Sequence, residues 1–538
     1  MSLEIDEEGY INLKVIFVGD SGVGKTNLIN VSSDGSFNEQ EATTSNASYV
    51  VKKTEVDGQK VNLYLWDTIG QERMRAITKL FFNDSKIVLL VYDITNKCTF
   101  ESLDFWLGQV KDCLDLDKIV IGICGNKNDL FENEEVSQEQ CKEFAEKINA
   151  QWSLTSAKEN RKIPELPLKL KIGYAWAENF EITYDKVLEA VKNGLNVIIW
   201  FALDMSSNSN STKPEFKGGP DYSKVVQTIK NLTENNYNVI NLISVGGWGA
   251  PHPDTRFTAE EYYEEWIKFN KRISNEESGF FGFDGLDWDI EGTDDINSSI
   301  NYFTYEELDL MGKFSKLLKN GGYIVSMAPA ESYIDSSTDE FSLSLLYNYP
   351  EWENELPNFT YHGRNAYAYL IAKYSIDTFD FISVQLYESW SHALYKFRKE
   401  HQFFGDILYN IVDNYTKGYL VDFSTDEKSG MDKKTIKIPQ NKLVIGLANA
   451  WAFGKALFID EKNITEGYHT LVKKNKDVRG FMFWSVGYEG DIPTSEDVSN
   501  KTEFFMAKVL NSVFNQPTSN SCIYSIPLFL EFLLLLYL

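Results

Sequence analysis

The sequence contains few of the residues on which disulfide-stabilised or nucleic-acid-binding proteins rely. It has five cysteines in 538 residues, and four of them precede residue 164, as expected of reduced cytosolic thiols. Residues 169–517 contain none, so disulfide bonds carry no information about the compartment of that part. Lysine and arginine number 52 against 79 acidic residues, giving a net charge of −27 without a basic stripe. Nucleic acid is therefore not expected as a partner.

Targeting signals are also missing from the places where they would be expected. Neither Met1 nor residues 155–175 show a charged segment followed by an apolar one. The chain as written is therefore expected in the cytoplasm. Its length is ample for two hydrophobic cores.

An acidic run at residues 284–291, Asp-Gly-Leu-Asp-Trp-Asp-Ile-Glu, follows the apolar stretch 279–283. It is predicted to be the carboxyl end of a buried strand. Residues two apart share one face of a strand, so Asp287, Asp289 and Glu291 should point together. Three neighbouring carboxylates in a half-buried site cannot all ionise cheaply, so at least one pKa should rise. A carboxyl group that stays protonated near neutral pH can serve as the general acid of a glycosidase.

This run matches the pattern Asp-x-x-Asp-x-Asp-x-Glu, and about residues 169–515 resemble the family 18 glycoside hydrolases, the chitinases and their relatives. Residues 244–247 are similar to the Ser-x-Gly-Gly motif of that family. Residues 385–387, Gln-Leu-Tyr, are similar to the strand that supplies its active-site tyrosine. The resemblance implies substrate-assisted, retaining hydrolysis of β-1,4-linked N-acetylglucosamine polymers, with no cofactor in this part of the chain.

The same resemblance assigns roles to single residues. Glu291 would be the general acid and base, Asp289 would orient the acetamido group of the sugar, and Asp287 would lie behind it. Tyr387 would hydrogen-bond the carbonyl, and Trp484 would stack on the sugar. Many family members have Asp or Asn where this chain has Glu388, which leaves the linkage preference open. The remaining expected contributors are Gln385, Glu388 and Trp248 for substrate binding, and Asp284, Ser244, Gly246 and Gly247 for local structure.

Strand-like and helix-like segments alternate across this region, independently of the resemblance. Eight such alternations in about 345 residues predict a (β/α)₈ barrel, whose active site lies at the carboxyl ends of the strands. The predicted strands are 171–176, 197–202, 239–245, 281–291, 323–329, 379–387, 443–449 and 480–485. The predicted helices are 184–193, 222–235, 259–273, 305–319 and 392–414.

The amino-terminal part carries a glycine-rich loop between the apolar run 13–18 and a helix-like segment, which is the setting of a phosphate-binding loop. Its backbone amides and Lys25 are suited to the β- and γ-phosphates, and Thr26 to Mg²⁺. The loop comprises Gly19, Asp20, Ser21, Gly22, Val23, Gly24, Lys25 and Thr26.

Later motifs make this part resemble the small GTPases, in particular the Rab branch. Residues 126–129 are similar to Asn-Lys-x-Asp, whose Asp selects guanine, and residues 66–73 resemble the second switch. Thr44 falls at the first-switch threonine that binds Mg²⁺. The resemblance implies GTP or GDP with Mg²⁺ as cofactor and GTPase regulators as partners. Its implied nucleotide site adds Thr44, Asp67, Gly70, Gln71, Asn126, Lys127, Asp129, Ser156, Ala157 and Lys158.

Two departures from that family affect what this part can do. Ile69 replaces the alanine of the second switch and could slow hydrolysis. Small GTPases continue from the Ser-Ala-Lys loop into a last helix, but Pro164 and Pro167 interrupt here and leave no room for one. A parallel sheet needs both faces covered, so an exposed apolar patch is expected unless the barrel packs there.

The domains are predicted at 1–163 (GTPase module without its last helix), 164–168 (linker), 169–517 (barrel) and 518–538 (apolar tail). The barrel alone would be expected to be secreted or on the cell surface. A true fusion and two adjacent genes joined in one gene model both explain the junction, and the short linker favours the second. The tail fits a lipid-anchor signal or an unstructured extension equally well. Glycoside hydrolysis is the favoured activity of the whole chain, and a GTP-regulated lectin or trafficking protein with an inactive barrel is the alternative.

Overall fold

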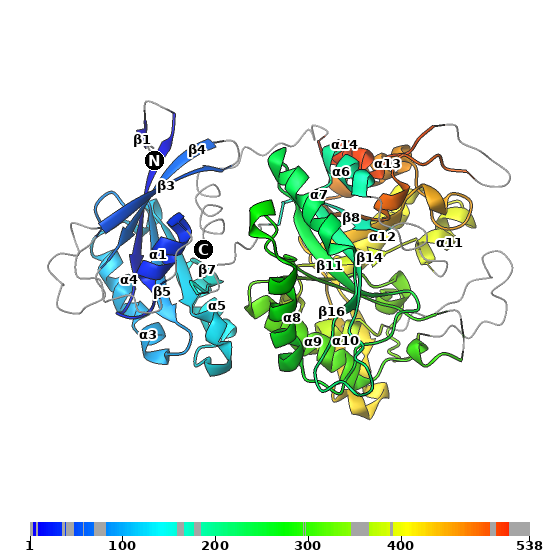
Figure 1. Cartoon of the computed structure of the whole chain (residues 1–538), viewed down its shortest axis with the longest axis horizontal. Coiled ribbons are helices and arrows are strands. Elements are labelled where there is room, and N and C mark those ends of the chain that lie inside the picture. The colour runs from blue at the N-terminus through cyan, green and yellow to red at the C-terminus, as the bar shows by residue number, and fades with distance from the viewer. Residues whose placement is uncertain are drawn as a thin grey trace. The chain divides into compact units, whose positions relative to one another are not determined.

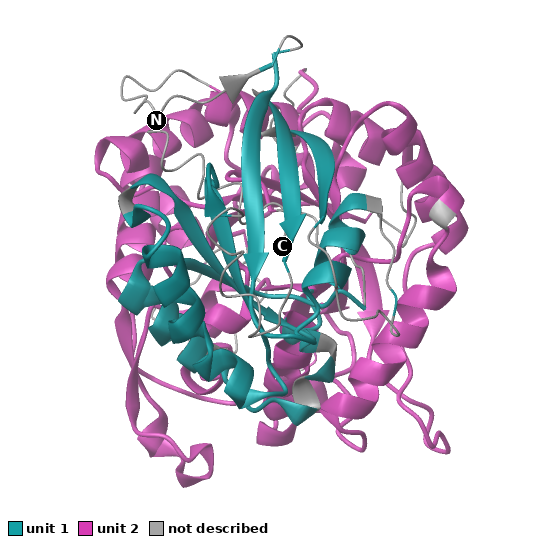
Figure 2. Cartoon of the chain, turned by 90° about the vertical axis from the view of Figure 1, so that its left-hand side faces the viewer, with its two compact units in different colours: residues 1–162, 320–322, 518–538 teal, residues 163–319, 323–517 magenta. Residues whose placement is uncertain are grey.

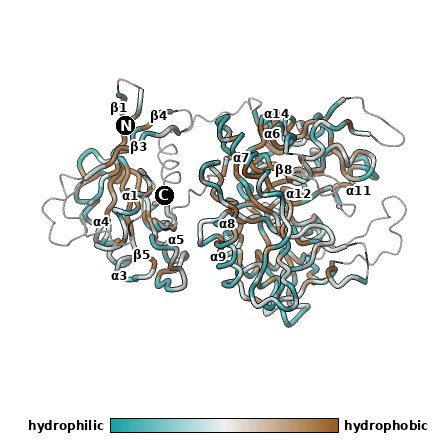
Figure 3. The backbone as a smooth tube through the Cα atoms, viewed as in Figure 1, coloured by the Kyte–Doolittle hydropathy of each residue, from teal (hydrophilic) through white to brown (hydrophobic). Residues whose placement is uncertain are grey.

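The computed structural model describes residues 4–6, 9–34, 38, 48–56, 59–68, 82–158, 166–176, 184–293, 295, 297–345, 365–387, 391–494 and 502–515. The chain forms two compact units, one built around residues 1–162 and the other around residues 163–319 and 323–517 (Figure 2). In each unit the central strands are among the most hydrophobic segments of the chain (Figure 3). Each unit therefore has its own hydrophobic core.

The amino-terminal unit contains a mixed sheet with the strand order β3-β4-β2-β5-β6-β7. Strand β3 pairs antiparallel with β4, while β4, β2, β5, β6 and β7 run parallel. A short strand, β1, pairs antiparallel with β2 off this path. The strands are β1 Glu4–Ile5, β2 Ile11–Val18, β3 Ser48–Val56, β4 Gln59–Asp67, β5 Ile87–Asp93, β6 Val120–Asn126 and β7 Gln151–Leu154.

Alternation along the strands of this sheet builds two separate apolar layers. The odd-numbered residues of β2 from Ile11 to Phe17 pack on one face together with helix α1. Ile16 and Val18 pack on the other face with α4 and α5. The helices are α1 Lys25–Asp34, α3 Lys97–Glu101, α4 Leu103–Lys111 and α5 Gln138–Ile148, with 3₁₀ turns at Leu116–Lys118 and Asn128–Asn133.

Within the described strands, the apolar patch expected on the α1 side of the sheet is not exposed. Leu13, Leu63 and Ile87 lie on that side and are at most 3% exposed. Between β7 and the first strand of the second unit, the described residues 155–158 and 166–169 contain no helix. The cover on this face is therefore not supplied by a described helix at the junction.

The second unit contains a closed barrel of eight parallel strands. Strand β8 pairs with both β18 and β9, which closes the barrel, and β10 is a short antiparallel addition to β9. The barrel strands β8, β11 and β14 are labelled in Figure 1. The barrel strands are β8 Leu170–Ala175, β9 Val197–Asp204, β11 Ile240–Gly247, β12 Gly285–Ile290, β13 Ile324–Met327, β14 Phe381–Gln385, β17 Leu443–Ala448 and β18 Gly480–Trp484. Lys217–Gly218 form β10, and Tyr419–Asp422 and Lys433–Ile436 form the hairpin β15–β16.

Helices lie between successive barrel strands, and several of them start at side-chain caps. Thr258 and Glu261 form a capping box at α8, while Asp221 and Asp460 accept from the first-turn amides of α7 and α13. The helices are α6 Tyr184–Lys192, α7 Tyr222–Glu234, α8 Ala259–Ile273, α9 Tyr305–Asn320, α10 Ala368–Tyr374, α11 His392–Arg398, α12 Phe404–Lys417, α13 Glu461–Lys473 and α14 Met506–Asn515.

Two predicted boundaries are wrong. The strand expected at 281–291 begins only at Gly285, because Gly279 and Gly282 adopt φ of +77° and +90°, outside the extended region. The helix expected at 392–414 is two helices, α11 and α12, and His401 between them has φ of +52°. None of the helices in the described part of the chain combines the length and apolar character needed to cross a bilayer.

Candidate functional site

The phosphate loop connects β2 to α1, and its glycines are required by the surrounding backbone and side chains. Gly22 and Gly24 have φ of +81° and +92°, which other residues rarely adopt. A Cβ atom on Gly24 would lie 2.3 Å from Asn126 Nδ2. A Cβ on Gly19 would lie 2.1 Å from the carbonyl oxygen of Val91. The loop can therefore approach β5 and β6 this closely only if positions 19 and 24 are glycine.

Lys25 is the buried cation of this loop. Its Nζ donates to the carbonyl oxygens of Gly19 at 2.9 Å and Asp20 at 2.7 Å. Burial lowers the pKa of the Lys25 ammonium to about 8, although Asp67 and Asp20 act in the opposite direction. Thr26 Oγ1 donates to Asp67 Oδ2 at 2.7 Å, which brings two oxygen ligands together beside the loop. This donor set fits a phosphate and a hard cation such as Mg²⁺.

Asn126 joins the phosphate loop to the Ser-Ala-Lys segment. Its Nδ2 donates to the carbonyl oxygen of Val23 at 2.7 Å. Its Oδ1 accepts from Thr155 Oγ1 at 3.3 Å and from the amide of Ala157 at 3.4 Å. The structure thus brings three of the predicted segments together around one buried amide, which is 1% exposed.

Other predicted residues of the nucleotide site surround this amide. Lys127 pairs with Asp93 at 2.6 Å, and Asp20 Oδ1 accepts from Trp106 Nε1 at 2.9 Å. Ser21 and Lys158 are exposed, and Ser156 is partly buried. The predicted residues Thr44, Gly70, Gln71 and Glu388 lie outside the described residues, as does the side chain of Asp129.

In the second unit, β12 carries the acidic run with the predicted alternation. Asp287 and Asp289 are buried, and Glu291 follows the strand directly and is partly buried. Trp288 points the other way, and its Nε1 donates to Ser315 Oγ on α9 at 2.8 Å. The carboxylates thus lie inside the barrel and the intervening indole packs outside.

Asp287 is the most enclosed of the three carboxyl groups. It accepts hydrogen bonds from Tyr174 at 2.5 Å, Ser326 at 2.6 Å and Ser244 at 3.4 Å, so strands β8, β13 and β11 all converge on it. Burial raises the pKa of Asp287 to about 6, although the three hydroxyl donors lower it.

Gln385 connects the other two carboxyl groups. Its Nε2 donates to Asp289 Oδ1 at 2.8 Å and to the carbonyl oxygen of Ala328 at 2.6 Å. Glu291 is hydrogen-bonded to both Asp289 and Gln385. Burial and the neighbouring charge of Asp289 raise the pKa of Glu291 well above its usual range. These contacts favour a protonated Glu291 that donates to the Asp289 carboxyl group.

The predicted glycine motif on β11 allows this strand to pass close to β12. Ser244 and Gly246 stand opposite Asp287 and Asp289 in the parallel register. A Cβ on Gly246 would lie 2.6 Å from the carbonyl oxygen of Asp289, and one on Gly247 would lie 2.2 Å from the Phe201 ring. Both glycines are therefore needed where they stand. The predicted structural residue Asp284 accepts from the amide of Asn241 at 2.7 Å.

Aromatic rings gather at the carboxyl ends of several barrel strands. Trp484, the last residue of β18, stacks on Trp176 with ring centroids 5.1 Å apart and lies edge-on to Phe201 at 4.8 Å. Tyr387, two residues beyond β14, lies edge-on to Trp451 at 6.3 Å. Trp248 follows β11 and is 63% exposed. Partly buried indoles at this end suit the apolar face of a sugar.

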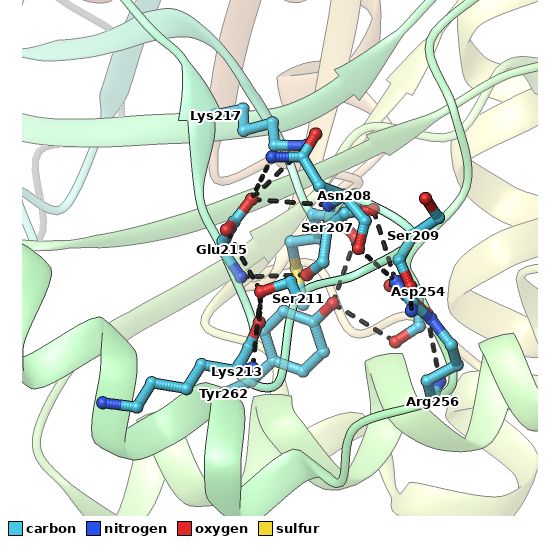
Figure 4. A network of polar contacts seen from close by, with 11 residues as sticks. Ser207, Asn208, Ser209, Ser211, Lys213, Glu215, Lys217, Asp254, Arg256 and Tyr262 are labelled. Atoms are coloured by element: carbon cyan, nitrogen blue, oxygen red, sulfur yellow. Dashed lines mark hydrogen bonds and ion pairs between the residues drawn. The ribbon is translucent and has the colours of Figure 1, made fainter.

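A polar network ties together the two loops that follow β9 and β11 (Figure 4). Arg256 donates to both carboxylate oxygens of Asp254 and to the carbonyl oxygens of Ser207 and Ser209. Tyr262 on α8 donates to the carbonyl oxygen of Met205 at 3.1 Å. These bonds hold the loop beyond β9 beside the loop that carries Trp248.

Sequence reasoning missed three polar residues that support the carboxylates. Tyr174 and Ser326 bond Asp287, and the Tyr367 hydroxyl accepts from the amide of Ile290 at 2.7 Å and donates to its carbonyl oxygen at 3.0 Å. A lone hydroxyl in an otherwise apolar strand was the available signal for Tyr174 and Ser326. Tyr367 lies outside every predicted strand and helix and offered no such pattern.

Comparison with known proteins finds similarity in the amino-terminal part. The family model described as Ras family matches residues 14–171. Ras-related protein Rab-21 from Bos taurus is 38% identical over 159 residues, which are 30% of this chain and 71% of that protein. Rab-21 from Geodia cydonium is 37% identical over 160 residues, 30% of this chain and 69% of that protein. Ras-related protein Rab-30 from Homo sapiens is 37% identical over 157 residues, 29% of this chain and 77% of that protein.

The family-model match covers strands β3 to β7, the phosphate loop and the Asn126 motif described above. The amino-terminal unit is thus a Rab-like domain of the kind that binds guanine nucleotide with Mg²⁺. Through this domain the chain belongs to the Ras family of small GTPases.

Proposed function

We propose that the barrel is a (β/α)₈ hydrolase of the family 18 type that cleaves β-1,4-linked N-acetylglucosamine polymers. The observation that carries this proposal is the bonded series Glu291–Asp289–Gln385 at the ends of β12 and β14. It supplies a carboxyl group with a raised pKa beside a second carboxyl group, and glycoside hydrolysis needs this pairing.

The proposed reaction is substrate-assisted and retains the anomeric configuration. Glu291 gives its proton to the leaving glycosidic oxygen as the acetamido oxygen of the same sugar attacks the anomeric carbon. Asp289 holds the acetamido N–H while the oxazolinium ion forms, and Gln385 keeps Asp289 oriented. Glu291, now ionised, then takes a proton from the water that opens this intermediate. Tyr387 bonds the acetamido carbonyl, and Trp484 stacks on the same sugar.

Asp287 acts behind this pair in the proposed mechanism. Its three hydroxyl donors fix its position, and its raised pKa allows it to hold a proton below about pH 6. When Glu291 has lost its proton, a neutral Asp287 reduces the negative charge that Asp289 faces. Asp287 therefore lowers the cost of the second half of the reaction.

Digestion of matched tetrasaccharides tests the proposal. The full chain should cleave chitotetraose but neither cellotetraose nor the fully deacetylated glucosamine tetramer, because only the first carries the attacking acetamido group. Equal cleavage of cellotetraose would replace the substrate-assisted scheme with a two-carboxylate one. Binding of chitotetraose without cleavage would support the alternative of a carbohydrate-binding barrel.

We further propose that the Rab-like domain hydrolyses GTP and is controlled by GTPase regulators. The loop amides and Lys25 would hold the β- and γ-phosphates, while Thr26 and Asp67 would hold Mg²⁺. Gln71 would orient the attacking water, and Ile69 beside it should make the intrinsic rate slow. Single-turnover GTP hydrolysis by the wild-type chain and by Ile69→Ala tests this. A variant no faster than the wild type would contradict the proposed effect of Ile69.

A further inference from the structure

The residues that follow β17 and β18 form a buried polar network around the main chain of Trp484. The Trp484 carbonyl oxygen accepts two hydrogen bonds, from the amide of Asn449 at 2.9 Å and from Trp451 Nε1 at 2.7 Å. Asn449 is completely buried, and its Oδ1 accepts from the amide of Ala450 at 2.7 Å. Both donors to Trp484 belong to the segment after β17, although Trp484 is the last residue of β18.

The Asn449 side chain extends this network to a buried carboxyl group. Its Nδ2 donates to the carbonyl oxygen of Ser485 at 3.3 Å and to Glu489 Oε1 at 2.7 Å. Asn449 thus contacts the main chain of two successive residues, 484 and 485, through its amide and its side chain. Its side-chain donor is shared between that main chain and Glu489.

Glu489 is a buried carboxyl group at the start of α14. It is 1% exposed and also accepts from the amides of Met506 at 2.9 Å and Ala507 at 3.3 Å, in the first turn of that helix. Burial raises the pKa of Glu489 to about 7, with a smaller contribution from Glu189 on α6, although the hydrogen bonds lower it. The carboxyl group therefore joins α14 to the segments that follow β17 and β18.

Capping of α14 does not by itself account for this carboxyl group. The exposed residues Asp221 and Asp460 cap α7 and α13 in the same barrel. An exposed carboxylate satisfies the first-turn amides of a helix without losing its hydration, whereas a buried one has to be compensated by further hydrogen bonds. The donor that Glu489 gains in its buried position is Asn449 Nδ2. The bond to Asn449 is thus what this position adds to a helix cap.

The same network fixes the main chain that carries two stacked indoles. Trp484 stacks on Trp176, and its ring centroid also lies 5.4 Å from that of Tyr174. Ser485 Oγ donates to the carbonyl oxygen of Trp176 at 2.8 Å. An indole has only two rotatable side-chain bonds, so its position follows that of its main chain. A shift of residues 484–485 would therefore move both indoles.

We propose that Asn449 and Glu489 are positioning residues that hold Trp484 in the orientation in which it stacks on the sugar. Asn449 acts through its bonds to the main chain of residues 484 and 485. Glu489 keeps the Asn449 side chain turned towards Ser485 by accepting from the same amide group. For the identity of the ligand this inference rests on the proposed function of the barrel, whereas the fixed orientation of Trp484 does not depend on it.

Fluorine NMR of the full chain labelled with 5-fluorotryptophan tests the positioning role without any substrate. The Trp484 signal is the one that Trp484→Phe removes. Asn449→Asp keeps the Oδ1 acceptor but replaces the Nδ2 donor by a second carboxyl oxygen beside Glu489. At pH 8 the two carboxyl groups should repel each other, so the Trp484 signal should shift and the KM for chitotetraose should rise about tenfold. At pH 5, where the variant is purified, the pair can share a proton, and both values should return towards those of the wild type at that pH.

Variants of Glu489 and a cap variant elsewhere complete the test. Glu489→Gln retains the Oε1 acceptor for Asn449 and should leave the Trp484 signal in place, whereas Glu489→Leu removes that acceptor and should shift the signal. Asp460→Ala is the matched control, because it removes the cap of α13 without touching this network.

Two outcomes would overturn the proposal. One is a Trp484 signal that stays in place in both Asn449→Asp and Glu489→Leu. The other is an equal shift in Asp460→Ala, which would reduce the effect to a general loss of stability. The expected shifts in a chain that cleaves no chitotetraose would support the positioning role and contradict the proposed hydrolase instead.

Discussion

Replacing Gly246 on β11 with alanine should displace the neighbouring strand β12 and the carboxyl groups that it carries. Gly246 has φ of +109°, and an added Cβ would lie 2.6 Å from the carbonyl oxygen of Asp289. The backbone strain alone is worth about 1–3 kcal/mol. Relief of the clash requires β12 to move, because the obstructing atom belongs to the backbone. We expect a total loss of about 3–5 kcal/mol in barrel stability.

The same movement should lower catalysis, because Asp289 and Glu291 follow the backbone that is displaced. A misplacement of about 1 Å at reacting groups can cost on the order of 100-fold in rate. Gly249→Ala is the matched control, since Gly249 has φ of +75° but no atom within 4 Å of an added Cβ. That variant should lose only about 1 kcal/mol.

Urea unfolding followed by tryptophan fluorescence measures the difference in barrel stability between the two variants, because nine of the twelve tryptophans lie in the barrel. Turnover of chitotetraose is measured on the same samples. Gly246→Ala and Gly249→Ala proteins that agree within about 0.5 kcal/mol in stability and cleave chitotetraose equally fast would contradict this prediction. In that case the close approach of β11 to β12 would not hold the carboxylates in place.

Three further predictions concern the nucleotide, pH and the isolated GTPase. The chain should bind GTP over ATP, and Asp129→Asn should shift preference towards xanthosine nucleotides in a competition assay; equal ATP and GTP affinity in the wild type would contradict this. Because burial raises the pKa of Asp287 to about 6, the folded barrel retains a proton that the unfolded chain releases near pH 4. This group should therefore lower the unfolding free energy of the wild type by about 3 kcal/mol relative to an Asp287→Asn variant as pH rises from 4 to 7, and paired urea titrations showing no such difference would refute the assignment. Residues 1–163 alone should be poorly soluble, and adding a last helix from an intact Rab protein should restore their solubility. A monomeric, cooperatively melting fragment would show that the missing helix is dispensable.

The features that could be predicted from the sequence are those whose residues all lie within one short segment of the chain. The phosphate loop has a fixed spacing, and the acidic run alternates along a single strand, so the positions of Lys25 on the loop and of Asp289 inside the barrel could be predicted from the sequence. The eight parallel strands were likewise visible as apolar runs separated by helical ones. In each case neighbours along the chain decide the structure.

The misjudged features depend on contacts between distant segments or on backbone conformation. The predicted start of β12 is too early because Gly282 lies in an apolar stretch of the sequence, whereas its φ of +90° is incompatible with an extended strand. Tyr174 and Asp287 are 113 residues apart and meet only when the barrel closes.

The most direct test of the proposed hydrolase is the turnover of chitotetraose by the full chain carrying Glu291→Gln. The substitution keeps the shape of the side chain and removes the proton donor, so kcat should fall by about 10²–10⁴-fold. The dissociation constant for the tetrasaccharide should change by no more than about threefold, because the proton of Glu291 is needed for bond cleavage and not for binding of the substrate in its ground state. Glu260→Gln, at an exposed position on α8, should behave as the wild type. Near wild-type turnover by the Glu291→Gln protein would contradict the assignment of Glu291 as the general acid.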